Sequence, residues 1–171
     1  MSAEHKYYGF EPAMSGNATF GIERIEDVGD ELRVLWREHY NETEVLYLNE
    51  EFNPDVDRYK AQEEAGQYVA FTVRIGKRLV GYLQYWVFRD MHSQGMYVAR
   101  EDAFFITKEY RGHKLAPKLL NYAESALVHL GCKYVGMTSK EPVGGPDIGG
   151  FLEKRGYRPV AMYFMKKLDG T

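Results

Sequence analysis

The spacing of apolar positions changes several times along the chain, and each change predicts a new element. A weak alternation from Thr19 to Ile25 predicts a first strand. From Asp27 to about Tyr40, apolar residues recur every three or four positions, which predicts an amphipathic helix. A second helix is expected to begin at Asn53–Pro54, where a capping residue precedes proline, and to end at Gly66.

The middle of the chain has the pattern of strands. Residues 69–75 alternate between apolar and polar, and the turn pair Gly76–Lys77 separates them from a second run over residues 79–88. A polar loop then leads to a third run over residues 96–106. Three strands joined by short connections predict an antiparallel meander.

The last third of the chain mixes helices and strands. Apolar residues step by three and four from Leu115 to Leu130, which predicts a long helix ended by Gly131. A strand over 133–138, a short helix over 148–155 and a last strand over 159–167 are expected to follow. The predicted fold class is therefore α+β, with a mixed, mostly antiparallel central sheet flanked by helices.

Composition narrows the classes of function. A length of 171 residues fits a single domain over residues 1–171, in which residues 1–18 are expected to form a loose N-terminal arm. The net charge of -3 counts against a nucleic-acid partner, and no apolar run reaches the length of a membrane span. The single cysteine, Cys132, fits a reducing cytoplasm and predicts a small buried residue rather than a nucleophile.

The most informative stretch runs from the third predicted strand into the long helix. The strand ends at Ile106, a short turn contains Arg111–Gly112, and the helix begins at once at Leu115. Backbone N–H groups at such a helix start have no partner within the helix, and the helix dipole is positive there. This arrangement predicts a site for an anion, above all a pyrophosphate.

Arg111 and Ala116 match the first and last positions of Arg/Gln-x-x-Gly-x-Gly/Ala, so the segment resembles motif A of the GNAT superfamily of N-acetyltransferases. Lys114 replaces the middle glycine of that pattern, and we expect this to be tolerated if the backbone there is already helical. Residues 151–157 and the apolar segment after them also resemble the C-terminal part of that superfamily. Several shorter pieces, His39-Tyr40-x-Glu42 among them, resemble a branch encoded by bacteriophages.

The resemblance implies a GNAT-like fold and acetyl-CoA as the acyl donor. It places the cofactor along the end of the third strand and on the turn after it, with one further contact near the C-terminus. The residues implied are Phe105, Ile106, Thr107, Arg111, Gly112, His113, Lys114, Leu115, Ala116 and Lys154.

Asp102 is the candidate general base, because an attacking amine must lose a proton and an acid on this strand can accept it. The alternative is a structural carboxylate paired with Arg100, Arg89 or His92. Glu101 is the second candidate, since a bulge in the strand would reverse which of the two acids faces the substrate. The resemblance implies a tyrosine acid at the position where Leu152 stands. Tyr163 and Tyr157 are nearby candidates for that role, and the alternative is that a thiolate leaves well enough to need no dedicated acid.

His39, Glu42 and His92 are candidates for contacts with the acceptor, and no spacing typical of a metal site is present. The function expected is transfer of an acetyl group from acetyl-CoA to a primary amine, of a small molecule or a protein, by direct attack. The alternative is a catalytically weak or inactive GNAT-fold binding module that acts on a host or phage protein. A cytoplasmic location is expected, that of the host if a phage encodes the chain, and pairing through the last strand would give a homodimer.

Overall fold

The computed structural model describes residues 8–43, 50–140, 148–166 and 168. These residues fall into two compact units, residues 1–137 and residues 138–171, which are described separately. None of the described helices is long and apolar enough to cross a membrane.

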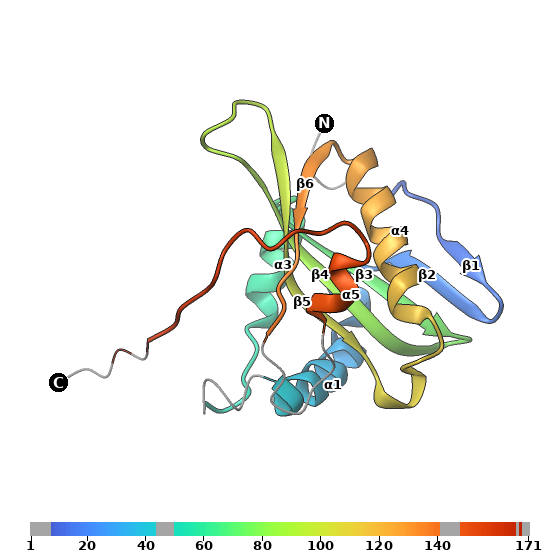
Figure 1. The fold of residues 1–171 in the computed structure, drawn as a ribbon. Coiled ribbons are helices and arrows are strands. Elements are labelled where there is room, and N and C mark those ends of the chain that lie inside the picture. The colour runs from blue at the N-terminus through green and yellow to red at the C-terminus, as the bar shows by residue number, and fades with distance from the viewer. Residues whose placement is uncertain (1–7, 44–49, 141–147, 167, 169–171) are drawn as a thin grey trace. The chain divides into compact units, whose positions relative to one another are not determined.

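The first unit is built on one six-stranded sheet in the order β1-β2-β3-β4-β5-β6 (Figure 1). All neighbouring strands are antiparallel except β5 and β6, which are parallel. The predicted mixed, mostly antiparallel α+β fold is therefore confirmed. The strands are β1 Ala13–Ser15, β2 Ala18–Ile22, β3 Tyr68–Ile75, β4 Arg78–Arg89, β5 Tyr97–Ile106 and β6 Cys132–Gly136.

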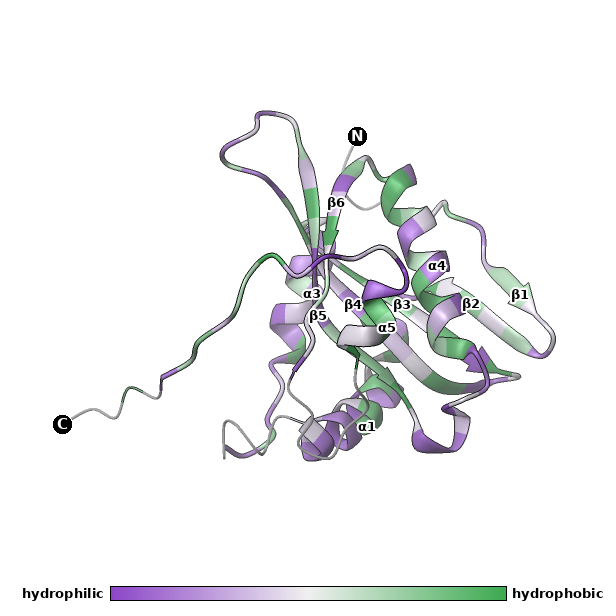
Figure 2. Cartoon of the chain, viewed as in Figure 1, coloured by the Kyte–Doolittle hydropathy of each residue, from purple (hydrophilic) through white to green (hydrophobic). Residues whose placement is uncertain are grey.

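Helices cover both faces of this sheet. Helices α1 (Ile25–Thr43) and α3 (Val56–Glu64) pack on one face through a core that includes Leu32, Trp36 and Tyr68. Helix α4 (Leu115–His129) packs on the other face, where Tyr122 contacts Phe71 edge-on. In Figure 2 the central strands are mostly apolar, while the outward side of α1 is mostly polar. Successive side chains of β3 and β4 point to opposite faces of the sheet and are buried on both, so the sheet carries a core on each side.

The predicted α4, its end at Gly131 and the meander of β3, β4 and β5 are confirmed within one or two residues. Helix α3 begins later than predicted, because Asp55 rather than Asn53 caps it: the Asp55 carboxylate accepts the N–H of Arg58 at 3.0 Å. At the start of the chain, residues 13–15 pair with β2 instead of belonging to a loose arm. Gly16, with a φ of +62°, is the turn residue that makes this hairpin.

The second unit contains one described helix, α5 (Gly149–Glu153), near the position predicted for it. The predicted last strand is wrong over residues 159–166, which form neither strand nor helix and are exposed. A strand exists only through hydrogen bonds to a neighbouring strand. The described part of this unit holds no strand that could pair with the segment, and an apolar run alone cannot reveal that. The predicted loop over residues 141–147 lies outside the described residues.

Candidate active site

Strand β5 loses one of its two neighbours halfway along its length. It pairs with β4 from Tyr97 to Ile106, whereas its parallel pairing with β6 ends at Arg100 opposite Gly136. Residues 101–106 therefore have one edge that no described strand covers. The N–H of Thr107 is donated to the carbonyl of Val80 on β4 at 3.0 Å. Because alternate N–H groups point to the same side of a strand, the N–H of Ile106 points to the open edge.

The open edge leads directly into the turn before α4. A short 3₁₀ helix, η2 (Lys108–Tyr110), follows β5, and the chain then turns through Gly112 with a φ of +83° and Lys114 with a φ of 60°. No side chain caps the start of α4. The free N–H groups of its first turn therefore include those of Leu115 and Ala116, whereas Pro117 has none. The predicted anion site thus has the geometry of an uncapped helix start.

Lys114 does not meet the condition under which the sequence led us to expect a lysine to be tolerated. The backbone there is not helical: Lys114 is left-handed and is the only described residue other than glycine with a positive φ. Such a conformation favours glycine, because a Cβ approaches the neighbouring carbonyl. The glycine that the motif has at this position is therefore explained by the backbone, and the chain keeps the conformation with a lysine.

Asp102 faces α1 and α3 because of a bulge. Between Gln84 and Tyr85 of β4 the partner on β5 moves from Ala103 to Glu101, so Asp102 is an extra residue on β5. The bulge turns Asp102 toward the face that carries Tyr68 and Trp86. Glu101 is left opposite Tyr85, whose side chain packs against Phe71 on the α4 side. The bulge therefore turns Asp102 toward the face of Tyr68 and Trp86, whereas from the sequence a bulge is expected to turn Glu101 toward it.

The Asp102 carboxylate accepts hydrogen bonds from two aromatic side chains. The Tyr68 hydroxyl donates at 2.7 Å to one oxygen, and the Trp86 indole N–H donates at 3.0 Å to the other. These partners replace the arginines and the histidine considered from sequence. Tyr68 and Trp86 were not predicted from the sequence, although they lie opposite each other in the β3–β4 register. Aromatic residues at facing strand positions are the signal that could have indicated them.

Two tyrosines around Asp102 are held in their protonated form. Burial and the nearby Asp102 charge raise the pKa of Tyr59 to about 12. The same two causes raise the pKa of the buried Tyr68 well above its usual value. Both hydroxyls therefore stay donors at neutral pH. A carboxylate has about four acceptor positions, so Asp102 keeps capacity for a further partner after its bonds to Tyr68 and Trp86.

A second polar pair lies close to the end of β5. The ring of His39 stacks on Phe105, with centroids 5.1 Å apart, and its Nδ1 lies 2.8 Å from the Tyr82 hydroxyl. Tyr82 is opposite Phe105 in the β4–β5 register, and burial raises its pKa well above the usual value. His39 therefore sits beside the open end of β5, on the same face as Asp102.

The remaining residues predicted for the site are spread over several parts of the fold. Glu42 forms an ion pair with Arg111 at 2.8 Å instead of facing an open space. His92 lies exposed in the β4–β5 loop, where its N–H is donated to Asp90, and about 30 Å of strand separates that loop from the turn after Ile106. His113 is exposed in the turn. Lys154 and Tyr163 belong to the second unit, and their roles stay predictions.

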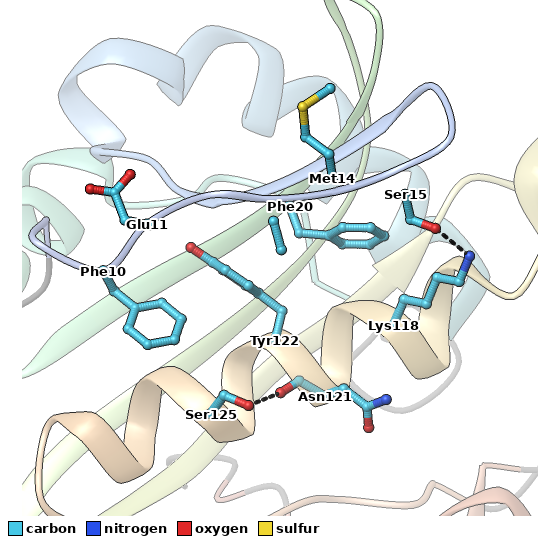
Figure 3. Close-up of a pocket in the computed structure, with 10 residues that line it drawn as sticks. Phe10, Glu11, Met14, Ser15, Phe20, Lys118, Asn121, Tyr122 and Ser125 are labelled. Atoms are coloured by element: carbon cyan, nitrogen blue, oxygen red, sulfur yellow. Dashed lines mark hydrogen bonds between the residues drawn. The ribbon is translucent and has the colours of Figure 1, made fainter.

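A hollow of about 440 Å³ lies elsewhere, between the β1–β2 hairpin and α4 (Figure 3). Phe10, Phe20 and Tyr122 form its apolar wall, and the Lys118 ammonium donates to the Ser15 hydroxyl at 2.6 Å at one end. Burial raises the pKa of Tyr122 to about 12. None of the predicted site residues lines this hollow.

The mixed sheet and the turn between β5 and α4 are those expected of a GNAT-like fold, and comparison with known protein families identifies the same family. Residues 28–157 match the model of the Acetyltransferase (GNAT) family. This chain therefore belongs to the acetyltransferase (GNAT) family. No curated protein sequence matches it.

Solved structures share the fold at low sequence identity. An aminoglycoside acetyltransferase from an uncultured soil metagenomic sample is 13% identical with a TM-score of 0.71, covering 91% of this chain and 100% of its own. Glucosamine-6-phosphate N-acetyltransferase from Arabidopsis thaliana is 14% identical with a TM-score of 0.66, covering 90% and 100%. Ribosomal-protein-alanine N-acetyltransferase from Brucella melitensis biovar Abortus 2308 is 14% identical with a TM-score of 0.64, covering 90% and 99%. At these identities the similarity shows the fold.

Proposed function

We propose that this chain transfers an acetyl group from acetyl-CoA to a primary amine by direct attack. The observation that carries the proposal is the open edge of β5 over residues 101–106, which leads into an uncapped helix start. An open strand edge offers N–H and C=O groups to an amide-bearing arm, and a helix start offers N–H groups to a pyrophosphate. These are the two parts of coenzyme A that a binding protein must hold.

Acetyl-CoA fits these residues. Its pantetheine arm is proposed to bind along Phe105, Ile106 and Thr107, and its pyrophosphate on the backbone of residues 111–116. The left-handed Gly112 and Lys114 lie in the turn that connects the end of β5 to the start of α4. Lys154 is proposed as a further contact.

The bound donor supplies an acetyl thioester. The amine nitrogen of the acceptor forms a bond to the carbonyl carbon, and the bond from that carbon to sulfur breaks. Asp102, or a water that it orients, takes the proton that the amine loses. The Ile106 N–H at the open edge is proposed to polarise the carbonyl, and the Phe105 N–H, on the β4 side, is the less suitable of the two. Tyr163 stays a proposed proton source for the departing thiolate, and Glu101 stays the second candidate for the general base.

The acceptor is proposed to be an amine of a small molecule or a protein. Aminoglycosides and glucosamine-6-phosphate, which the names of two structural neighbours mention, both contain such amines. His39, on the Asp102 face, supports an acceptor site there, and His92 is proposed only for a larger acceptor that extends to the β4–β5 loop. A bacteriophage origin, action in the host cytoplasm, a homodimer and a single domain over residues 1–171 belong to the same proposal.

Calorimetry of acetyl-CoA binding to the purified chain tests the donor site. We expect saturable binding that is lost in Gly112→Asp, which adds a Cβ at a positive φ and a negative charge beside the pyrophosphate. A folded wild-type chain that binds no acetyl-CoA would refute the proposal. Release of coenzyme A with a panel of amines then tests the reaction.

Asp102→Asn tests the general base. The amide keeps the shape of the carboxylate but cannot accept the proton, so we expect turnover to fall about a hundredfold or more while acetyl-CoA affinity stays the same. The matched control is Asp90→Asn in the β4–β5 loop, which should leave turnover unchanged. Equal turnover of Asp102→Asn and wild type would remove Asp102 from the mechanism.

A further inference from the structure

The side chain of Arg111, in the turn between β5 and α4, is held by three contacts and is only partly exposed. Its Nε donates to the Ile106 carbonyl at 2.8 Å, and one terminal nitrogen donates to the Glu42 carboxylate at 2.8 Å. The guanidinium also lies over the Phe105 ring, 5.2 Å from its centroid. Arg111 therefore joins the end of β5 to the end of α1.

Glu42 lies where its own helix disfavours it. It is in the last turn of α1, at the negative end of the helix dipole, and that turn carries no basic residue. The compensating charges come from another part of the chain. Arg111 pairs with one oxygen of the carboxylate, and the Lys108 ammonium lies 3.8 Å from the other. Both cations belong to the turn between β5 and α4. Arg111 lies 69 positions after Glu42 in the sequence.

We infer that Glu42 is a positioning residue for the turn between β5 and α4, which is proposed to bind acetyl-CoA, and that it acts through Arg111. This inference rests on the proposed binding of acetyl-CoA to that turn. Because Glu42 holds Arg111 against α1, the backbone that follows Arg111 is fixed before the pyrophosphate arrives. The phosphate charge is then met by backbone N–H groups, since the Arg111 guanidinium is already paired.

The inference revises the role that the sequence indicates for Glu42. A carboxylate that binds the acceptor amine directly would raise the KM for the acceptor when removed and would leave acetyl-CoA affinity alone. A carboxylate that positions the turn changes acetyl-CoA affinity, which calorimetry measures without any acceptor or turnover.

Four chains are compared by calorimetry with acetyl-CoA: wild type, Glu42→Gln, Arg111→Gln and the double variant. We expect each single substitution to weaken binding about threefold to tenfold, the size expected of one half-exposed charged hydrogen bond. Because both changes break the same contact, the double variant should bind no more weakly than the weaker single variant. Glu38→Gln, one turn earlier on α1, removes the same charge without touching Arg111 and should bind like wild type.

Glu42→Asp separates geometry from charge. Aspartate keeps the negative charge but is one methylene shorter, so it cannot hold Arg111 at the same distance. We expect Glu42→Asp to weaken acetyl-CoA binding in the same range as Glu42→Gln. Thermal unfolding of each variant establishes that it is folded before its affinity is interpreted.

Three results would overturn the inference: affinity of Glu42→Gln within twofold of wild type or tighter, losses in the single variants that add in the double variant, or normal affinity of Glu42→Asp. These results differ from a failure of the proposed function. If the folded wild type binds no acetyl-CoA, the proposed function fails. If the wild type binds and Glu42→Gln binds equally well, only the role of Glu42 is refuted.

Discussion

Lys114, in the turn between β5 and α4, allows a direct test of whether its left-handed backbone lowers the stability of the folded protein. It occupies the position just before α4 with a left-handed backbone, a φ of 60° and a ψ of 19°, and its side chain is exposed. A residue with a Cβ loses about 1–2 kcal/mol in this conformation. Lys114→Gly removes that loss but gives the unfolded chain more freedom, which costs about 0.4–1 kcal/mol. We therefore expect the free energy of unfolding to rise by roughly 0.5–1 kcal/mol.

The gain is measured by urea unfolding, followed by circular dichroism at constant pH and salt. For a chain of this size it corresponds to a rise in Tm of about 1–4 °C. Lys114→Ala is the matched control, because it removes the same charge and chain but keeps the Cβ. Its stability should stay close to wild type, and acetyl-CoA binding should survive in Lys114→Gly.

Two results would refute this reasoning. If Lys114→Gly is less stable than wild type, the left-handed backbone carries no strain that a glycine can relieve. If Lys114→Ala gains as much as Lys114→Gly, the gain comes from the removed side chain and not from the backbone.

Two further predictions concern the sheet and the entry to α1. A Cβ at Gly81 would lie 2.8 Å from the Phe105 carbonyl oxygen on β5, so Gly81→Ala should lower the free energy of unfolding by about 1–3 kcal/mol. The control is Gly21→Ala, where a Cβ would meet no atom within 4 Å and the loss should be much smaller. Equal losses in the two variants would contradict the close approach of β4 and β5. The Glu63 carboxylate accepts the N–H of Ile25 at 3.0 Å, and burial raises the pKa of Glu63 above its usual 4.5. Above pH 4.5 the folded state therefore holds more protons than the unfolded state, and stability falls as the pH rises through the raised pKa. As the pH rises over that range, the free energy of unfolding of Glu63→Gln should increase relative to that of wild type. A constant difference between the two free energies from pH 4.5 to 8 would show that Glu63 does not titrate there.

The sequence alone predicted most of the elements of the first unit, because their signals are local. Alternation marked β3, and the three-four period marked α1 and α4. The motif at Arg111 indicated the turn and the helix start correctly, since the order of strand, turn and helix is itself a sequence property. The conformation of Lys114 was missed, because a lysine gives no sign of a left-handed backbone.

Only the tertiary structure decided what the candidate catalytic and charged groups face. The bulge that turns Asp102 toward Tyr68 and Trp86 depends on the register between β4 and β5, which two strands determine together. The pairing of Glu42 with Arg111 joins residues 69 positions apart, and no local pattern encodes such a contact. The predicted last strand failed for the same reason. Periodicity describes one segment and its own faces, whereas a hydrogen-bonded strand, a bulge or an ion pair is a property of two segments that the fold brings together.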